Sequence, residues 1–504
     1  MAASNVSVAS ACLWGVEALP IQVEVATSAG LPGISIVGLP GAGVMDARSR
    51  VRCALKSCGF KMPPLHYTVN LAPAGIRKNG TGFDLPIAVA VLALSGQMST
   101  EGLDRCLFVG ELGLAGEVCE TRGTVAYQML ARRLGVRLVG AGGATLGADG
   151  CDLRPLRSLA DLRRGVKELP RASRPAPGLA PSGDGRVKGL DFVDVYGQEE
   201  AKRALVIAAA GKHGLLMVGS PGAGKTMLAR RLPSILPPLT DAELEEVLLM
   251  SSVSGQPVDD MAVFRRRPFR APHHSVSLGG LVGGGRPVIP GEISLAHHGV
   301  LFLDELPEFA TNVLQALRQP MEDRCVRLVR VDGLYSFPCD FQLVAAANPC
   351  PCGHLGDPAR SCSCAPGRVQ AYQGRIGGPL MDRIDLHLDV RRPPSQLVVK
   401  GVRGMGSAQM RELVMGARER RARRARRSVG AAAPLAERLL MEGSAQSCLE
   451  GLAARLALGG RTIVKIARVA RTIADVEGSD KVLRDHVLEA SGYRSRAGER
   501  EGHV

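Results

Sequence analysis

Aromatic side chains are scarce in this chain of 504 residues, at 3%, and tryptophan occurs once. Any nucleic-acid binding would therefore depend on arginine and lysine more than on base stacking against aromatic rings. The longest apolar run, Leu85 to Leu94, is too short to cross a bilayer and contains a proline. The N-terminus lacks a basic start followed by an apolar core, so no secretory signal is expected. These absences favour a cytoplasmic protein without a membrane partner.

Negative charge is in deficit: 63 Lys and Arg stand against 48 Asp and Glu, for a net charge of +15. This excess favours a polyanionic partner, although it would also suit a protein that only needs solubility. The segment from Arg418 to Arg427 is mostly arginine, and Arg420, Arg424 and Arg427 share one side of a predicted helix. Such a helix would contact DNA phosphates without sequence preference, or would simply be a solvated surface.

Composition divides the chain into three structured regions and a linker. Residues 1–165 alternate short β-rich runs with helical stretches, and residues 166–190 have the Pro, Gly, Ser and charge content of an exposed linker. Residues 191–394 alternate apolar strands with helices, which predicts an α/β fold with a parallel sheet covered on both faces. Residues 395–504 are mostly helical by pattern. The strands expected in the α/β region include Leu215–Val218, Val300–Leu303 and Gln342–Ala346.

One segment has the eight-residue pattern of a phosphate-binding loop. It follows an apolar strand and precedes a helix predicted over 227–232, which is the context that this motif requires. Glycines let backbone amides turn onto phosphate oxygens, and the helix N-terminus adds partial positive charge. We expect Lys225 to reach the β- and γ-phosphates of ATP and the Thr226 hydroxyl to bind Mg²⁺. The loop consists of Gly219, Ser220, Pro221, Gly222, Ala223, Gly224, Lys225 and Thr226.

Polar residues that complete a phosphoryl-transfer site follow later strands. Asp304 and Glu305 end the strand Val300–Leu303, where Asp304 would hold Mg²⁺ through water and Glu305 would polarise the attacking water. Asn348 follows the next strand and either points at that water or belongs to a turn. Arg383 lies among carboxylates, where it is either a structural salt-bridge partner or a group that reaches a neighbouring subunit's nucleotide.

Thirteen cysteines are expected to stay reduced in the cytoplasm, as packing residues or metal ligands. Four of them follow the pattern C-x-C-x9-C-x-C, which predicts either a tetrahedral Zn²⁺ site or an unmetallated loop, since the spacing is tighter than the usual C-x2-C. These four are Cys350, Cys352, Cys362 and Cys364. Two histidine pairs, 273–274 and 297–298, are assigned structural or loop roles rather than zinc binding.

Several longer motifs carry a family resemblance. The runs Pro268–His274, Gly291–Gly299 and Asn348–Gly353, together with the acidic pair, resemble magnesium-chelatase-like AAA+ ATPases. The runs Val69–Ala74 and Asn79–Pro86 narrow the resemblance to the bacterial YifB/ComM family. It extends through nearly the whole chain.

The resemblance implies a hexameric ring that binds ATP between subunits. Its fold would be an AAA+ P-loop NTPase core with a helical lid, preceded by an α+β Lon-protease-like domain of the ribosomal S5 domain 2 type. Asn348 would be the sensor, Arg383 the arginine finger acting in trans, and Arg461 the second sensor arginine. Lon proteolysis uses a Ser–Lys dyad, but the matching segments contain Thr81 and, over 120–125, no lysine. We therefore expect this domain to be non-proteolytic.

The function that this resemblance implies is an ATP-driven motor on branched or single-stranded DNA, a branch-migration helicase of the kind used in natural transformation. Three alternatives remain open at this stage. The chain would be a magnesium-chelatase-like motor subunit, an ATP-dependent protease or remodelling protein that acts on a protein partner, or a nucleotide switch with little turnover.

Overall fold

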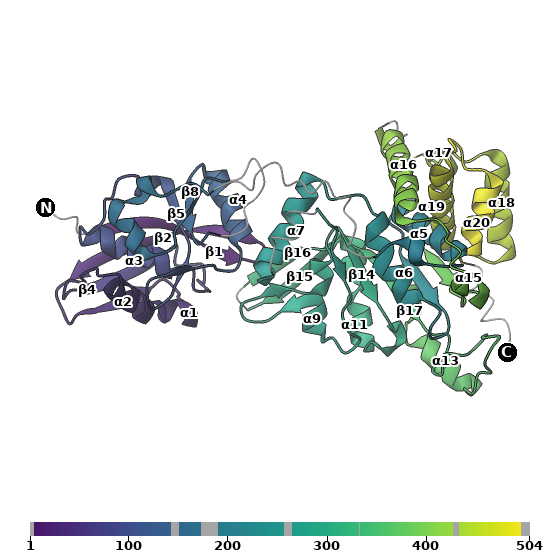
Figure 1. The fold of residues 1–504 in the computed structure, drawn as a ribbon, viewed down its shortest axis with the longest axis horizontal. Coiled ribbons are helices and arrows are strands. Elements are labelled where there is room, and N and C mark those ends of the chain that lie inside the picture. Colours follow the sequence, from purple (N-terminus) through teal and green to yellow (C-terminus); the bar gives the residue numbers. More distant parts are fainter. Residues whose placement is uncertain are drawn as a thin grey trace.

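The computed structural model places an N-terminal sheet domain at one end, a second sheet in the middle and a group of helices at the other end (Figure 1). The residues that the structure describes are 5–142, 151–172, 190–256, 265–331, 333–426 and 433–494. Within these ranges, no helix is both long enough and apolar enough to span a membrane.

The N-terminal domain is built on a seven-stranded sheet in the order β3-β4-β2-β1-β5-β8-β9. The long strands β1 and β2 pair antiparallel, as do β2 and β4, while the remaining neighbours are parallel. The strands are β1 Asn5–Trp14, β2 Glu17–Ser28, β3 Gly33–Val37, β4 His66–Ala72, β5 Cys106–Phe108, β8 Arg137–Gly140 and β9 Leu153–Pro155.

Helices cover both faces of this sheet. Helix α2 (Ala47–Ser57) and helix α3 (Asp84–Leu94) enclose one core, and α4 (Thr124–Leu134) encloses the other. The apolar run that the sequence shows as too short for a bilayer is α3, which is buried from Asp84 to Ala93. Val166 and Leu169 are buried in the same core, so the folded domain continues past residue 165 into the segment read as linker.

The central sheet is five-stranded, parallel throughout, and ordered β11-β14-β17-β10-β18. Its strands have apolar sequences because helices cover both faces. The strands expected at 215–218 and 300–303 are confirmed, and the third extends by one residue to Ala347. The strands are β10 Leu215–Val218, β11 Phe269–Arg270, β14 Val300–Leu303, β17 Gln342–Ala347 and β18 Leu386–Asp389. Since these strands are parallel, the residues that follow β10, β14 and β17 lie at one edge of the sheet.

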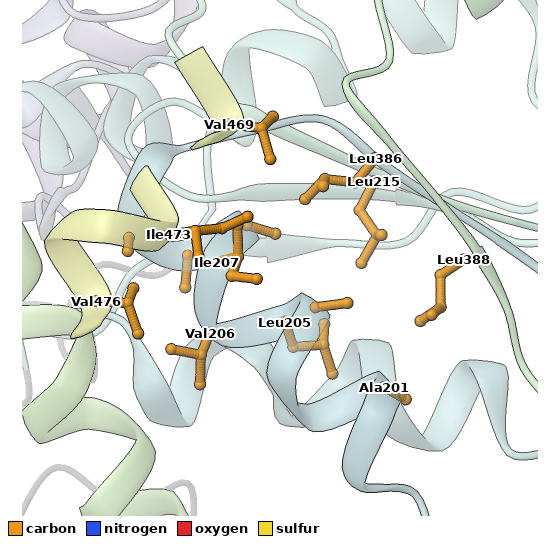
Figure 2. Close-up of a cluster of buried hydrophobic side chains, with 14 of the residues drawn as sticks. Ala201, Leu205, Val206, Ile207, Leu215, Leu386, Leu388, Val469, Ile473 and Val476 are labelled. Atoms are coloured by element: carbon orange, nitrogen blue, oxygen red, sulfur yellow. The ribbon is translucent and has the colours of Figure 1, made fainter. Parts of the chain in front are cut away.

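Helix α5 (Glu199–Gly211) joins this sheet to the C-terminal helices. Figure 2 shows Leu205 and Ile207 of α5 beside Leu215 and Leu386 of the sheet, with Ile473 of α19 nearby. Sheet, α5 and C-terminal helices therefore share one hydrophobic core. The larger C-terminal helices are α16 Ser407–Arg426, α18 Gly443–Arg455, α19 Gly460–Glu477 and α20 Arg484–Gly492.

Among the residues that the structure describes, two groups of contacts join the N-terminal domain to the central domain. Helix α4 lies on α7 (Asp241–Ser254), where Val125 packs on Leu248 and Arg132 forms a double hydrogen bond with Glu245 at 2.9 and 3.0 Å. In the second group, Trp14 stacks on Tyr335, with ring centroids 5.0 Å apart. Tyr335 belongs to the hairpin of β15 (Cys325–Arg330) and β16 (Gly333–Pro338).

Candidate nucleotide site

The predicted phosphate loop connects β10 to helix α6 (Lys225–Arg231). This helix starts two residues earlier than the sequence pattern predicts, because Gly224, at a φ of +94°, turns the chain directly into it. Lys225 and Thr226 are polar and so fall outside the apolar period that suggested a start at 227. Both side chains therefore project from the first helical turn, where the amides of the loop converge.

Lys225 is buried, and its ammonium group is hydrogen-bonded to the phosphate loop itself. Its Nζ atom donates to the carbonyl oxygens of Gly219 at 2.7 Å and Ser220 at 3.2 Å, and to Asn348 Oδ1 at 3.1 Å. Burial lowers the pKa of Lys225, while the charges of Asp304 and Glu305 oppose that shift. The structure thus brings together the predicted loop lysine and the predicted sensor asparagine.

The acidic pair lies beside the same loop. Thr226 Oγ1 donates to Asp304 Oδ2 at 2.6 Å, so the two predicted Mg²⁺ ligands are already adjacent. Glu305 follows in the left-handed region at a φ of +53°, which is uncommon for a residue other than glycine and is typical of functional sites. Its side chain is 54% exposed, with Oε2 3.4 Å from His274 Nδ1.

The loop has the geometry that a chain of phosphates requires. A Cβ atom on Gly219 would come within 2.2 Å of the carbonyl oxygen of Val390, the residue after β18, so only glycine allows the loop to pass so close to this backbone. Gly222 has a φ of +79° and no neighbour within 4 Å of a Cβ atom built there. A backbone turned outward beside open space fits a polyanion held by amides.

Arg383 lies at the other end of the sheet. It precedes β18, and the next residues bond to Gly214 just before β10, whereas the phosphate loop follows the C-terminal end of β10. Because β10 and β18 pair side by side, the length of one four-residue strand separates the two ends, which amounts to more than about 10 Å at roughly 3.3 Å per residue. The guanidinium of Arg383 bonds Glu322 of α12 (Arg318–Asp323) and the Pro379 carbonyl. Arg383 is therefore remote from the nucleotide loop of its own chain.

Arg461 is placed at this same remote end. It is exposed in the first turn of α19, and its neighbour Lys465 forms a 2.9 Å ion pair with Asp385. The structure thus does not bring Arg461 to the phosphate loop of its own chain.

Asp385 makes the attachment of α19 to the sheet sensitive to acid. Burial alone would raise the pKa of Asp385, but a hydrogen bond from His213 and the charge of Lys465 hold it well below its usual range. A carboxyl whose pKa is depressed by folding stabilises the fold above its unfolded pKa, near 4, and loses that contribution as the pH falls further. We expect Asp385→Asn to lower the free energy of unfolding at pH 7 by about 1–3 kcal/mol and to weaken its acid dependence. Urea denaturation at pH 7 and below pH 4 measures both; parallel acid profiles for variant and wild type would contradict this assignment.

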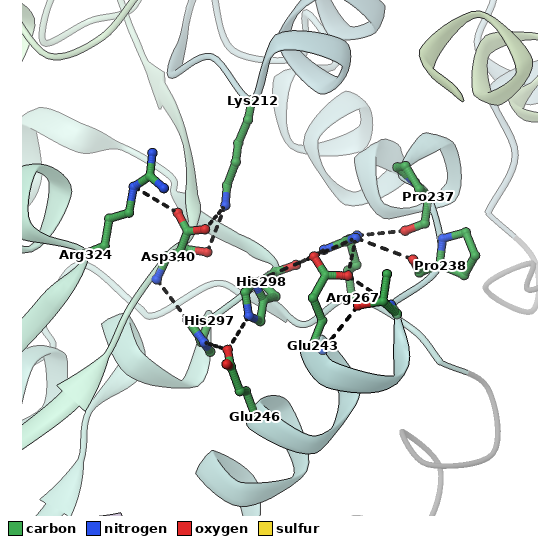
Figure 3. Close-up of polar contacts among 11 residues, drawn as sticks. Lys212, Pro237, Pro238, Glu243, Glu246, Arg267, His297, His298, Arg324 and Asp340 are labelled. Carbon is green, nitrogen blue, oxygen red and sulfur yellow. Dashed lines mark hydrogen bonds and ion pairs between the residues drawn. The ribbon is translucent and has the colours of Figure 1, made fainter. Parts of the chain in front are cut away.

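The second histidine pair belongs to a polar network at this remote edge (Figure 3). Glu246 Oε2 lies 2.8 Å from His297 Nε2 and 2.6 Å from His298 Nε2. Because His297 Nδ1 accepts the Asp340 amide, its Nε2 atom must carry the proton that it shares with Glu246. A protonated Nε2 has no lone pair for a metal ion. Glu246, His297 and His298 offer ligand atoms within 4.8 Å of one another, so the structural role expected for this pair agrees with these contacts and stays a prediction.

The basic helix is α16, and its arginines are more engaged with protein than the sequence indicates. Arg424 forms a bidentate ion pair with Asp475 of α19 at 2.6 and 2.7 Å, and Arg420 donates to the Asp475 carbonyl at 2.8 Å. At these two positions the side predicted to contact DNA also contacts α19, and the DNA contact stays a prediction there; the third member, Arg427, lies outside the described residues. Arg424 is half-buried, whereas the exposed arginines of α16 include Arg420, Arg421, Arg423 and Arg426.

In the N-terminal domain, Thr81 and Lys78, three residues before it in the sequence, are bound to other groups. Thr81 Oγ1 donates to Glu111, and the fully buried Lys78 donates to the Pro73 carbonyl. Burial lowers the pKa of Lys78. A nucleophile that donates to a carboxylate, with a lysine directed elsewhere, is not the arrangement of a Ser–Lys dyad.

The four cysteines predicted as zinc ligands converge. Cys350, Cys352 and Cys362 have Sγ–Sγ distances of 3.4, 3.6 and 3.6 Å, and Cys364 lies within 4.8 Å of the other three sulfurs. The amides of Leu355 and Cys364 donate to the sulfurs of Cys350 and Cys362. The sulfurs are too far apart for disulfides, whose S–S bond is about 2.05 Å long.

Three residues that lie at the site are not assigned to it by the sequence. His274 meets Glu305, and Gln198 ties the loop to the sheet by donating to the carbonyls of Ala223 at 3.1 Å and Arg391 at 2.7 Å. Asp357 of the cysteine loop reaches the same region. A single glutamine or aspartate in a loop has no spacing signal, and the histidine pair 273–274 gives no sign of a contact with Glu305, so only the fold reveals these contacts.

Comparison with known proteins supports the same grouping. The family described as "Magnesium chelatase, subunit ChlI" matches residues 191–398, its C-terminal family matches residues 404–494, and "Subunit ChlI of Mg-chelatase" matches residues 23–139. The chain is 42% identical over 492 residues to YifB of Escherichia coli (strain K12), with 95% of each chain covered. It is 41% identical over 491 residues to the competence protein ComM of Haemophilus influenzae, covering 95% of this chain and 96% of that one. The 67 kDa magnesium-chelatase subunit of Heliobacterium mobile is 29% identical over 236 residues, 40% of this chain and 31% of the subunit. The chain therefore belongs to the YifB/ComM family of magnesium-chelatase-like proteins, with a P-loop NTPase core and an additional N-terminal domain.

Proposed function

We propose that this protein hydrolyses ATP and uses the energy to move along DNA. The observation that supports hydrolysis is the meeting of Lys225, Thr226, Asp304 and Asn348 around one glycine loop. Thr226 and Asp304 would hold Mg²⁺, which would neutralise phosphate charge. Lys225 would exchange its bonds to the loop carbonyls for phosphate oxygens, and Glu305 would orient water. Calorimetry with Mg·ATP tests the site: no heat of binding with folded protein would refute it.

We propose a ring of identical subunits, and the placement of the arginines supports it. Arg383 and Arg461 lie away from the phosphate loop of their own chain, so each would act on the nucleotide of a neighbour. The family resemblance makes a hexamer the natural closed assembly, with ATP between subunits. Light scattering with and without Mg·ATP reports the subunit number; a monomer under both conditions would contradict this arrangement.

DNA is proposed as the track because a relative of similar length is named a competence protein and because the chain carries a charge of +15. Branched or single-stranded DNA, bound without sequence preference, suits arginines directed at phosphates. Long DNA should stimulate ATP turnover at low salt, and ATP should drive movement of a four-way junction. If the rate of ATP turnover is the same with and without DNA, the alternative is favoured, a motor that remodels a protein partner. The match to magnesium-chelatase subunits is compatible with that alternative.

Substitutions of the exposed arginines of α16 and of the arginine paired with Asp475 should have different effects. The double variant Arg423→Ala, Arg426→Ala removes exposed charges, so the slope of log binding constant against log salt should fall by about 2. Arg424→Ala instead leaves Asp475, which is 5% exposed, without that partner, so it should lower thermal stability with little change in slope. Fluorescence anisotropy across salt concentrations and a thermal melt provide both readouts. Equal slopes for the double variant and wild type would remove α16 from the DNA interface.

Zinc is proposed as a second metal, on the four cysteines. A tetrahedral Zn²⁺ with Zn–S bonds of about 2.3 Å places its sulfurs roughly 3.8 Å apart. The three closest Sγ–Sγ distances, 3.4, 3.6 and 3.6 Å, are near that value. Thiolates are the ligands that Zn²⁺ prefers in structural sites, and amide donors such as those of Leu355 and Cys364 stabilise them.

A further inference from the structure

The four-cysteine loop, residues 349–365, lies directly against the phosphate loop. It starts after Asn348, the residue bound by Lys225, and ends at helix α13 (Pro366–Gly374). Gly353 has a φ of +81°, and a Cβ atom there would lie 2.6 Å from the Pro221 ring. Only glycine permits both this backbone conformation and this approach. The two loops therefore touch at the cluster of thiols.

Asp357, at the turn of the four-cysteine loop, is the polar connection. Its carboxylate is only 2% exposed and lies 3.4 Å from the guanidinium of Arg392, which in turn donates to the Pro221 carbonyl at 3.0 Å. The Ser220 side chain also approaches this carboxylate. Asp357 Oδ1 accepts the Ala359 amide at 2.9 Å, so the carboxylate is oriented by its own loop. Asp357 is thus tied to Pro221 of the phosphate loop through Arg392, with Ser220 of the same loop nearby.

The position of Asp357 depends on how its loop is closed. Between Pro349 and Ala365 the structure contains no helix or strand, and most side chains are partly or fully exposed. A segment of this kind gains little stability from hydrophobic burial, while ordering each residue costs about 1–2 kcal/mol. The four sulfurs lie together where the two ends of the loop meet. Asp357 falls in the sequence between the first pair of cysteines and the second. A metal ion there would fix the loop, as structural zinc does in small folds.

We propose that Zn²⁺ bound by Cys350, Cys352, Cys362 and Cys364 holds Asp357 against the phosphate loop and thereby sets the affinity for nucleotide. This proposal rests on the proposed ATP site. Asp357 acts as a positioning residue through Arg392 and Ser220. Loss of zinc would release Asp357 and weaken nucleotide binding without removing any group that touches phosphate.

The test measures zinc content and nucleotide affinity separately in four variants of the full-length chain. Cys362→Ser with Cys364→Ser should lose zinc and bind Mg·ATP about tenfold more weakly, the effect of losing one charge-assisted contact. Asp357→Asn should keep about one zinc per chain and show a similar loss of affinity. Cys448→Ser, a cysteine of helix α18, and Asp104→Asn, an exposed aspartate of the N-terminal domain, are the matched controls and should resemble wild type.

The outcomes distinguish the two proposals. Wild-type protein with less than about 0.2 zinc per chain, or with disulfides among the four cysteines by mass spectrometry, would overturn the metal site. Unchanged affinity in Asp357→Asn would overturn the link to the phosphate loop, even if the cysteine variant fails to fold. Wild-type protein that contains zinc yet binds no Mg·ATP would refute the proposed function and leave the metal site standing.

Discussion

Arg383→Ala is expected to lower ATP turnover about a thousandfold while leaving nucleotide affinity within about twofold of wild type. An arginine that stabilises charge on the transferred phosphoryl group contributes 10³ or more to the rate and little to ground-state binding. In the isolated chain, Arg383 is bound to Glu322 and is remote from its own phosphate loop. The loss would therefore arise at the interface with a neighbour. Steady-state turnover and titration with a fluorescent ATP analogue measure the two quantities.

Mixing experiments distinguish action in trans from a structural role. Arg383→Ala chains keep an intact phosphate loop, and Lys225→Ala chains keep an intact arginine, so mixed rings should regain part of the activity that neither variant has alone. Arg375→Ala is a suitable control, because Arg375 is 57% exposed and pairs only weakly with Glu308 at 3.5 Å. If Arg383→Ala and Arg375→Ala hydrolyse ATP equally well, Arg383 is not the finger.

Glu305→Gln should reduce turnover at least a hundredfold and still bind Mg·ATP. A carboxylate that takes a proton from attacking water contributes about 10²–10⁴ to the rate, and glutamine retains its shape without its basicity. The exposed side chain of Glu305 and its left-handed backbone leave the carboxylate directed out of the strand end. Single-turnover measurements should show ATP bound but uncleaved.

His274 offers a graded comparison for this experiment. Its ring is 3.4 Å from Glu305 Oε2 and is not a proposed phosphate ligand. His274→Ala should therefore change turnover by a smaller factor than Glu305→Gln does, through the orientation of the carboxylate. A Glu305→Gln variant with wild-type turnover would exclude Glu305 as the base and direct attention to another carboxylate.

The central fold and the phosphate site were largely predictable because their signals are local. A glycine loop between an apolar strand and a helix, and an acidic pair at the end of a buried strand, each define their own structure. The parallel arrangement then requires that Thr226, Asp304 and Asn348 meet at one edge. The expected fold of the N-terminal domain and the candidate roles of Arg383 and Arg461 came only from the resemblance to a known family.

What the sequence did not predict depends on packing between distant segments. The side of α16 that carries Arg420 and Arg424 looks like a free basic surface until Asp475 of α19 is placed against it. The sequence pattern places the start of α6 too late because its first turn is polar, and a segment of linker-like composition contains Val166 and Leu169, which are buried in the N-terminal core. Asp357 is one aspartate among several loop residues, and only the closing of the cysteine loop brings it to Pro221.

The double attachment of the N-terminal domain has a consequence for dissecting this protein. Leu248 and Tyr335 are far apart in the sequence of the central domain. Val125 of the N-terminal domain covers Leu248, and Trp14 of the same domain covers Tyr335. Expressing residues 190–494 alone would uncover both patches in a fragment that also lacks the partner of Glu245. This truncated fragment would be prone to self-association. The contribution of the N-terminal domain is therefore better measured with point substitutions at these interdomain contacts than with a truncated chain.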